Sequence, residues 1–153
     1  MQFAPRLIDP PASLTANAMS IDVEEHFQVQ ALSDQYAREI WPQLESRVAR
    51  NTERALQCFS DSGARATFFV LSWVAERHKD LMRRIVAEGH EIASHGVSHI
   101  RADSQSRHQF REDVRTSKKI IEDASGAAVI GFRAATFSIG AGNLWAFEIL
   151  ADE

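Results

Sequence analysis

Short apolar runs that suit β-strands alternate with amphipathic stretches that suit helices along most of this chain. The runs cover residues 17–23, 66–71, 91–94 and 129–132. Strands that alternate with helices form parallel sheets joined by right-handed crossovers. Four such strand–helix units are about half of a (β/α) barrel, which typically takes about 250 residues. The pattern therefore predicts an α/β fold, either a small open sheet or an incomplete (β/α) barrel.

Apolar spacing and terminal glycines predict the helices between these strands. The expected helices cover residues 51–62, 74–88, 106–124 and 143–150. Asn51 is expected to cap the first helix and Gly63 to end it. The run at 66–71 is apolar throughout, which indicates a strand buried on both faces. Cys58 lies in an apolar helical run, which predicts a small buried side chain.

The composition is that of an ordinary globular protein and limits the possible partners. The chain has 153 residues, 44% hydrophobic and 25% charged, with a net charge of −4. It is long enough for one domain with a core, and its charge gives no electrostatic reason to expect nucleic acid as a partner. The oligomeric state stays open.

The first residues are expected to lie outside the folded domain. Pro5, Pro10 and Pro11 make residues 1–16 an extended lead-in, so that residues 17–153 form the domain. This segment lacks the uninterrupted apolar core of a signal peptide. No apolar run approaches the roughly 18 residues of a membrane span. We therefore expect no membrane anchor and a cytoplasmic location.

Polar clusters follow three of the four predicted strands. The carboxyl ends of parallel strands meet at one edge of a sheet, where α/β enzymes place their chemistry. Two histidines and a carboxylate form a three-ligand site with room for water, the usual form of a catalytic metal centre. The candidate site residues are Asp22, Glu24 and Glu25 after the first strand, His95 and His99 after the third, and Arg133 after the fourth.

The histidines and the arginine each have a second interpretation. A spacing of four puts His95 and His99 on one face of a helical turn, within reach of one ion. The same spacing is explained by two exposed loop histidines. Arg133 taken alone suits a surface arginine, whereas beside a catalytic carboxylate it would keep that group ionised and oriented.

The acidic cluster also has two interpretations. Three acids within four residues suit a solvated turn as well as a site. Alternation along an extended segment puts Asp22 and Glu24 on one side of the strand and Glu25 on the other. A hydrolase needs one carboxylate on the metal and a second one free to take a proton.

Three segments resemble the motifs of the polysaccharide deacetylases, the NodB homology domain or carbohydrate esterase family 4. They are residues 17–27, 89–99 and 131–139, and residues 66–70 match the strand between the first two. The resemblance is closest to the branch associated with bacterial exopolysaccharide and exosortase gene clusters. It implies a (β/α) barrel of the NodB type.

The resemblance also implies roles, a cofactor and a substrate. Asp22 would be the catalytic base, paired with Arg133. The ion would be zinc, with cobalt or nickel as alternatives, and the partner an acetylated oligo- or polysaccharide that loses N-acetyl groups. The implied metal ligands are His95, His99 and Glu24, with Glu25 the less favoured carboxylate.

The sequence departs from the family pattern in places. Ala135 stands where proline is usual, and Glu25-His26 where relatives commonly carry aspartate and an aromatic residue. The last two motifs, which supply a hydrophobic wall and a histidine general acid, have no match, so we expect the N-terminal part of such an enzyme. Two alternatives remain: a hydrolase of another non-peptide amide with the same metal site, and an inactive metal- or glycan-binding remnant.

Overall fold

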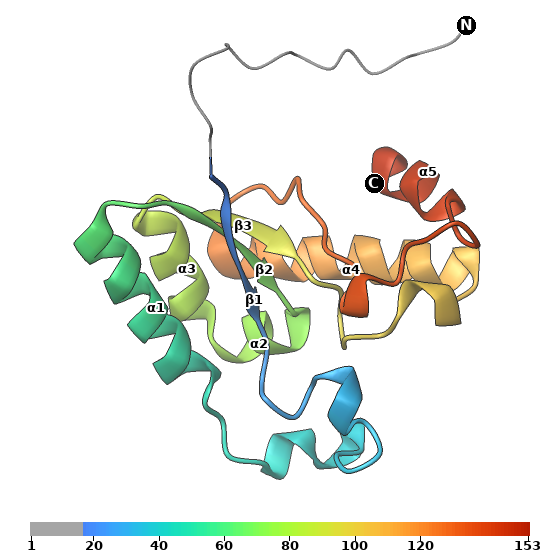
Figure 1. Cartoon of the computed structure of the whole chain (residues 1–153), viewed down its shortest axis with the longest axis horizontal. Helices are drawn as coiled ribbons and strands as arrows, with labels where there is room; N and C mark the ends of the chain where they lie inside the picture. The colour runs from blue at the N-terminus through green and yellow to red at the C-terminus, as the bar shows by residue number, and fades with distance from the viewer. Residues whose placement is uncertain (1–16) are drawn as a thin grey trace, which may run out of the picture.

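The computed structural model describes residues 17–153, and the expected lead-in at 1–16 lies outside the described residues. At its centre is a parallel sheet of three strands in the order β1-β2-β3 (Figure 1). The register aligns Asp22 of β1 with Phe69 of β2, and Phe69 with Ala93 of β3. The strands are β1 (Met19–Val23), β2 (Ala66–Val70) and β3 (Glu91–Ser94).

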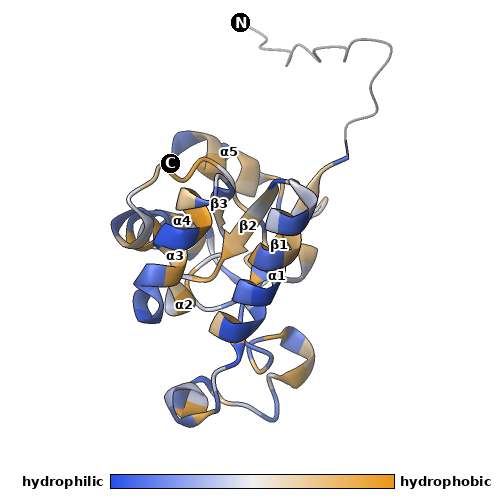
Figure 2. Ribbon diagram, turned by 90° about the vertical axis from the view of Figure 1, so that its left-hand side faces the viewer, coloured by the Kyte–Doolittle hydropathy of each residue, from blue (hydrophilic) through white to orange (hydrophobic). Residues whose placement is uncertain are grey.

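Helices occupy the connections between the strands, as the alternating pattern predicts. The α-helices are α1 (Val48–Ser62), α2 (Ser72–Arg77), α3 (Lys79–Ala87), α4 (Arg107–Ser125) and α5 (Trp145–Asp152). Short 3-10 helices are η1 (Gln30–Leu32), η2 (Arg38–Gln43), η3 (Ala102–Ser104) and η4 (Ala135–Phe137). The strands are coloured mainly as hydrophobic, and the outer surface of α1 as hydrophilic (Figure 2).

Helices α1 to α4 pack on one face of the sheet and build the main core. Phe68 and Val70 of β2 are completely buried there, together with Leu56 of α1, Met82 of α3 and Ile121 of α4. Full burial of such a side chain contributes about 1.5–3 kcal/mol. This face therefore fixes the sheet against the helices.

The other face of the sheet, called here the inward face, is only partly buried. Thr67 and Phe69 of β2 lie on it and alternate with the buried residues Ala66, Phe68 and Val70. The prediction that this strand is buried on both faces is therefore wrong. In a closed barrel, side chains from the remaining strands fill the interior, and residues 17–153 supply only three strands.

The predicted fourth strand at 129–132 is reduced to an isolated parallel bridge between Ser94 and Phe132. The backbone N–H of Ser94 donates to Gly131 O at 2.8 Å, and Arg133 N–H donates to Ser94 O at 2.9 Å. Ile130 is 87% exposed. Residues 129–132 therefore lie beside β3 without forming a regular strand.

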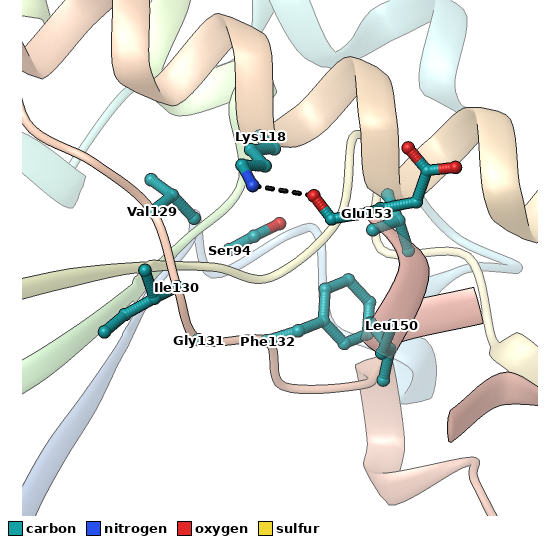
Figure 3. Close-up of a pocket in the computed structure, with 9 residues that line it drawn as sticks. Ser94, Lys118, Val129, Ile130, Gly131, Phe132, Leu150 and Glu153 are labelled. Atoms are coloured by element: carbon teal, nitrogen blue, oxygen red, sulfur yellow. Dashed lines mark hydrogen bonds between the residues drawn. The ribbon is translucent and has the colours of Figure 1, made fainter. Parts of the chain in front are cut away.

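A pocket lies between this segment and helices α4 and α5 (Figure 3). Phe132 and Leu150 line it on one side, and Val129 and Ile130 on another. The ammonium of Lys118 donates to the backbone oxygen of Glu153 at 2.7 Å. The lining of this pocket includes none of the predicted site residues.

Two predictions about α1 are wrong. The helix begins at Val48, so Asn51 lies inside it and does not cap it. The buried Glu25 carboxylate instead accepts the N–H of Arg47, the N-cap residue, at 3.0 Å. A negative charge is favourable at this helix end. Cys58 is exposed, because it lies beside the buried stripe of α1 and not on it.

The remaining helix boundaries follow the sequence with one exception. The helix expected at 74–88 is interrupted at His78, whose φ of −130° and ψ of 51° are not helical, and this divides it into α2 and α3. Gly63 and Gly126 end α1 and α4 in the left-handed conformation, as predicted. No helix within 17–153 has the length and apolar character needed to cross a membrane.

Candidate metal centre

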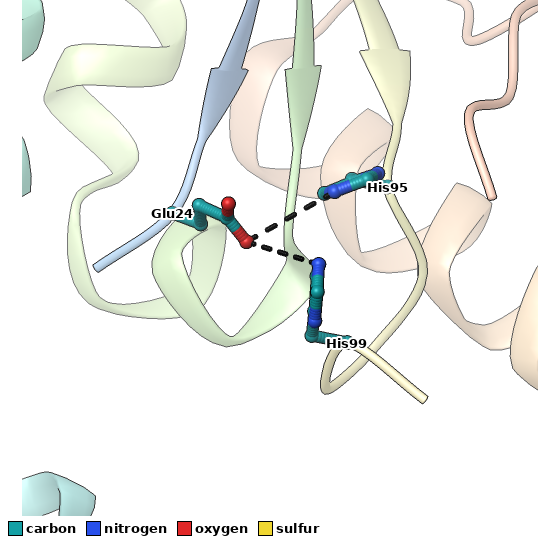
Figure 4. A group of neighbouring side chains, drawn as sticks. All are labelled: Glu24, His95 and His99. Atoms are coloured by element: carbon teal, nitrogen blue, oxygen red, sulfur yellow. Dashed lines mark ion pairs between the residues drawn. The ribbon is translucent and has the colours of Figure 1, made fainter. Parts of the chain in front are cut away.

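Glu24, His95 and His99 converge at the carboxyl ends of β1 and β3 (Figure 4). Glu24 Oε2 lies 3.3 Å from His99 Nε2 and 4.0 Å from His95 Nε2. Potential ligand atoms of all three residues lie within 4.8 Å of one another. Asp22 and Glu24 share one side of the strand because side chains alternate, as the sequence predicts. Two segments of the predicted site, far apart in the sequence, are thus brought together.

The two histidines meet through a loop and not through a helical turn. Residues 95–99, called here the histidine loop, have no regular secondary structure, and Gly96 and His99 have φ values of +84° and +54°. The imidazole centroids are 5.1 Å apart. The prediction that a spacing of four brings them together is confirmed, but its helical explanation is wrong.

Hydrogen bonding defines the tautomer of His95. Its Nδ1 lies 2.8 Å from the backbone oxygen of Arg133. A carbonyl oxygen can only accept, so Nδ1 carries the proton and Nε2 offers its lone pair toward Glu24. Such a bond orients and strengthens a metal-ligating imidazole.

An unsatisfied polar atom indicates that the group fits a cation. Within residues 17–153, Glu24 Oε2 is buried without a hydrogen-bond partner, and a buried unpaired polar group costs about 1–3 kcal/mol. Two imidazoles and one carboxylate are a donor set that zinc accepts while keeping a fourth position open. The residues present therefore fit the metal that the resemblance implies.

Burial shifts the protonation of all three side chains. It raises the pKa of Glu24 to about 7, and the negative charge of Asp22 adds to this effect, so a bound cation would favour the charged form that a carboxylate ligand requires. Burial lowers the pKa of His99 to about 4, with a smaller contribution from His95, and it also lowers the pKa of His95. Both imidazoles are therefore neutral at neutral pH, with lone pairs available.

Arg133 lies across the inward face beside this group. Its Nη1 donates to Asp22 Oδ1 at 2.5 Å and its Nη2 to Ser20 Oγ at 2.7 Å. The guanidinium carbon stands 4.0 Å from the centre of the Phe69 ring. Asp22 and Phe69 are register partners, so both project from the same face of the sheet.

The predicted catalytic pair and the metal group share one cavity of about 210 Å³. Asp22 and Arg133 form one wall of the cavity, and the histidine loop forms another. The lining residues are Asp22, Glu24, Val29, Gln30, His95, His99, Arg133, Ala134, Thr136 and Phe137. The structure thus places five of the six predicted site residues around a single space.

The sequence also matches a known protein family. The sequence model of the Polysaccharide deacetylase family matches residues 37–144, well over half of the chain. The chain belongs to the polysaccharide deacetylase family. The match begins after Glu24 and contains both histidines and Arg133.

The relatives of this chain are longer than the matched region. A peptidoglycan-N-acetylglucosamine deacetylase of Bacillus cereus is 31% identical over 71 residues, 46% of this chain and 33% of that protein. The chain thus spans about a third of that relative's length.

Solved structures show the same fold. A putative polysaccharide deacetylase from Mycobacterium smegmatis superposes with a TM-score of 0.72 at 22% identity, over 88% of this chain and 47% of that one. A CE4-family pseudoenzyme from Bacillus anthracis superposes with a TM-score of 0.63 at 18% identity, over 88% and 39% of the two chains. The fold is an incomplete (β/α) barrel of the NodB type.

Glu25 is the one predicted site residue that the cavity does not include. Its carboxylate is completely buried and accepts from Ser46 Oγ at 2.5 Å and from the N–H of Arg47. Glu25 therefore holds the start of α1. The carboxylate that the sequence analysis favoured less as a metal ligand therefore bonds to Ser46 and Arg47 and does not line the cavity.

Sequence reasoning missed two features of the candidate site. Thr136 and Phe137 have left-handed φ values of 54° and 50°, and Phe137 is 81% exposed at the rim of the cavity. Asp113 of α4 accepts the N–H of Val97 in the histidine loop at 3.2 Å. No local sequence pattern predicts either feature. The one indication is that Phe137 follows Arg133 closely in the sequence.

Proposed function

We propose that this chain carries the metal centre and catalytic base of a hydrolase that removes N-acetyl groups from a polysaccharide or glycan precursor. The observation that carries the proposal is the Glu24–His95–His99 group beside the Asp22–Arg133 pair in one cavity. The name of the Bacillus cereus relative, a peptidoglycan-N-acetylglucosamine deacetylase, supports an acetylated amino sugar as substrate.

Glu24, His95 and His99 would hold one divalent ion. Nitrogen and oxygen donors favour zinc, and they also suit cobalt or nickel. A divalent ion bound there would supply a Lewis acid that polarises the acetyl carbonyl and lowers the pKa of a water molecule. Glu24 Oε2, which has no hydrogen-bond partner among the described residues, would then be bonded to the ion.

Asp22 is the base in this proposal. Its carboxylate takes a proton from water while the water oxygen forms a bond to the acetyl carbon, and the carbon–nitrogen bond then breaks. Asp22 precedes Glu24 by two residues, so the alternation along β1 puts both side chains on the side of the cavity. The hydrogen bond from Arg133 orients the Asp22 carboxylate. The guanidinium also balances one of the two neighbouring negative charges. The departing amine needs a proton, and no residue lining the cavity is assigned as its acid.

Metal analysis tests the centre. The 153-residue chain, loaded with zinc and dialysed, is expected to hold one ion per chain by elemental analysis. The double variant His95→Ala/His99→Ala should hold none, because two of three ligands are lost. His108→Ala, an exposed histidine of α4, is the matched control and should keep the ion. Retained stoichiometric zinc in the double variant would contradict the assignment.

Product analysis tests the reaction. Acetate release from acetylated chito-oligosaccharides supports the proposal, whereas hydrolysis of cyclic amides alone supports a different amide hydrolase. Zinc binding without turnover of either compound supports the second candidate, a metal- or glycan-binding protein without activity. The pseudoenzyme from Bacillus anthracis, with the same fold, gives that candidate a precedent.

A further inference from the structure

The histidine loop is held in place along its backbone by neighbouring elements. Three N–H donors and two carbonyl acceptors of residues 95–97 are bonded to groups outside the loop. The bonds are His95 N to Val70 O (2.8 Å), Gly96 N to Ser94 Oγ (3.1 Å), Val97 N to Asp113 Oδ1 (3.2 Å), Ser72 N to Gly96 O (3.0 Å) and Trp73 N to Val97 O (3.2 Å). The path of the loop between its two histidines is therefore fixed.

Asp113 is the one charged side chain among these partners of residues 95–97. It extends from α4, next to the buried residue Val114, and is itself partly buried. Burial raises the pKa of its carboxyl group to about 6, against the opposing effect of the Val97 N–H and of Arg38. Burying a carboxylate costs free energy that an apolar residue at this position of α4 would not cost. The packing of α4 therefore does not explain why an aspartate lies here.

The carboxylate also lies against the backbone of Gly96. A Cβ atom at Gly96 would come within 2.8 Å of Asp113 Oδ2, and the φ of +84° already favours glycine there. Asp113 Oδ1 binds the next peptide, that of Val97. The two carboxylate oxygens of Asp113 thus lie against Gly96 and Val97, two successive residues of the loop that connects His95 to His99.

We propose that Asp113 is a positioning residue that sets the place of His99 relative to His95 and thereby the metal affinity of the Glu24–His95–His99 group. The inference rests on the proposed metal centre. Asp113 acts through the backbone of the histidine loop and touches no predicted ligand atom. Partners that orient metal ligands typically change affinity by about 10–100-fold when removed.

The test compares substitutions at Asp113 in the 153-residue chain. Asp113→Ala removes the acceptor, and zinc affinity should fall about 10-fold or more, measured by competition with a chromophoric chelator. Asp113→Asn keeps an oxygen that can accept from Val97 N–H, and it should restore an affinity close to that of the wild type. Glu112→Ala, an exposed neighbour on α4, is the matched control and should bind as the wild type does.

The cobalt-loaded chain adds a readout that a purely structural role would not change. The visible absorption of bound cobalt should shift in Asp113→Ala and stay unchanged in Asp113→Asn and Glu112→Ala, because only the first alters ligand geometry. If Asp113→Ala does not fold, Asp113→Ser, which is too short to reach Val97, takes its place with the same expectation.

The outcomes separate this inference from the proposed function. Wild-type affinity and spectrum in the Ala or Ser variant would overturn the role of Asp113 while leaving the metal centre in place. Equal loss in Asp113→Asn would also overturn it, because the hydrogen bond would then not be the cause. A wild-type chain that binds neither zinc nor cobalt would instead refute the metal centre itself.

Discussion

Glu24 carries the largest electrostatic cost of the candidate site. Its Oε2 is buried without a hydrogen-bond partner, and its pKa is raised from 4.5 to about 7. The folded chain therefore holds this proton more tightly than the unfolded chain. Between these two pH values the folded state binds more protons, so the free energy of unfolding falls as the pH rises through that window.

Replacing Glu24 should reveal this cost in the metal-free chain. Glu24→Gln resembles the protonated form, so it should be more stable than the wild type at about pH 8, by up to about 3 kcal/mol. The difference should disappear below the unfolded pKa of 4.5. Urea unfolding in the presence of a chelator at several pH values measures it. The exposed Asp34→Asn is the control, and a difference that does not change with pH would contradict the prediction.

Asp22→Asn separates the proposed base from the proposed metal ligands. The variant should keep one zinc ion, because Glu24, His95 and His99 are intact, and should lose acetate release by about 100-fold or more. Elemental analysis and product analysis measure the two effects on the same preparation. Loss of the zinc together with the activity would show that Asp22 is a ligand and not only a base.

Helix α4 depends on its own amino-terminal cap. Ser106 Oγ accepts from the N–H of Gln109 at 3.3 Å, and Gln109 Oε1 accepts from the N–H of Ser106 at 2.9 Å. Together they satisfy two backbone donors that the helix leaves free. Because α4 also carries Asp113, the cap supports the element that contacts the histidine loop.

Ser106→Ala should lower the free energy of unfolding by about 1 kcal/mol, because one cap oxygen is lost. Ser60→Ala on the exposed side of α1 makes the same chemical change without a cap and should stay within about 0.5 kcal/mol of the wild type. Urea unfolding of the three proteins measures both. Equal loss in the two variants would show that the cap does not stabilise α4.

At the scale of the whole molecule, the sheet has an open edge within residues 17–153. Residues 129–132 pair with β3 on one side through a single bridge, and Ile130 is 87% exposed. Exposed apolar edges of this kind promote association between chains. The partly buried inward face, with Thr67 and Phe69, adds to the exposed surface.

The 153-residue chain should therefore associate as its concentration rises. Ile130→Lys should reduce this association, because a charge on an edge opposes pairing. Sedimentation velocity over a concentration series measures the effect. Leu144→Lys, at an exposed apolar residue that precedes α5, is the control and should associate as the wild type does. A wild-type chain that stays monomeric at every concentration would contradict the prediction.

The sequence by itself determined the features that depend on local periodicity. Alternating apolar runs predicted β1, β2 and β3, and Ser106 and Gly126 bounded α4 to within a residue. A period of two put Asp22 and Glu24 on one side and Glu25 on the other. These predictions were right because strand alternation and helix ends are set by nearby residues.

Only the tertiary structure decided the features that depend on partners far along the chain. Glu25 accepts the N–H of Arg47 at the start of α1, which lies before Asn51, and residues 129–132 pair with β3 through one bridge only. The histidine loop is fixed by Asp113, although no local pattern links Asp113 to Val97. Each of these outcomes depends on a hydrogen bond or packing contact between distant segments, and such contacts form only when the sheet and helices have assembled.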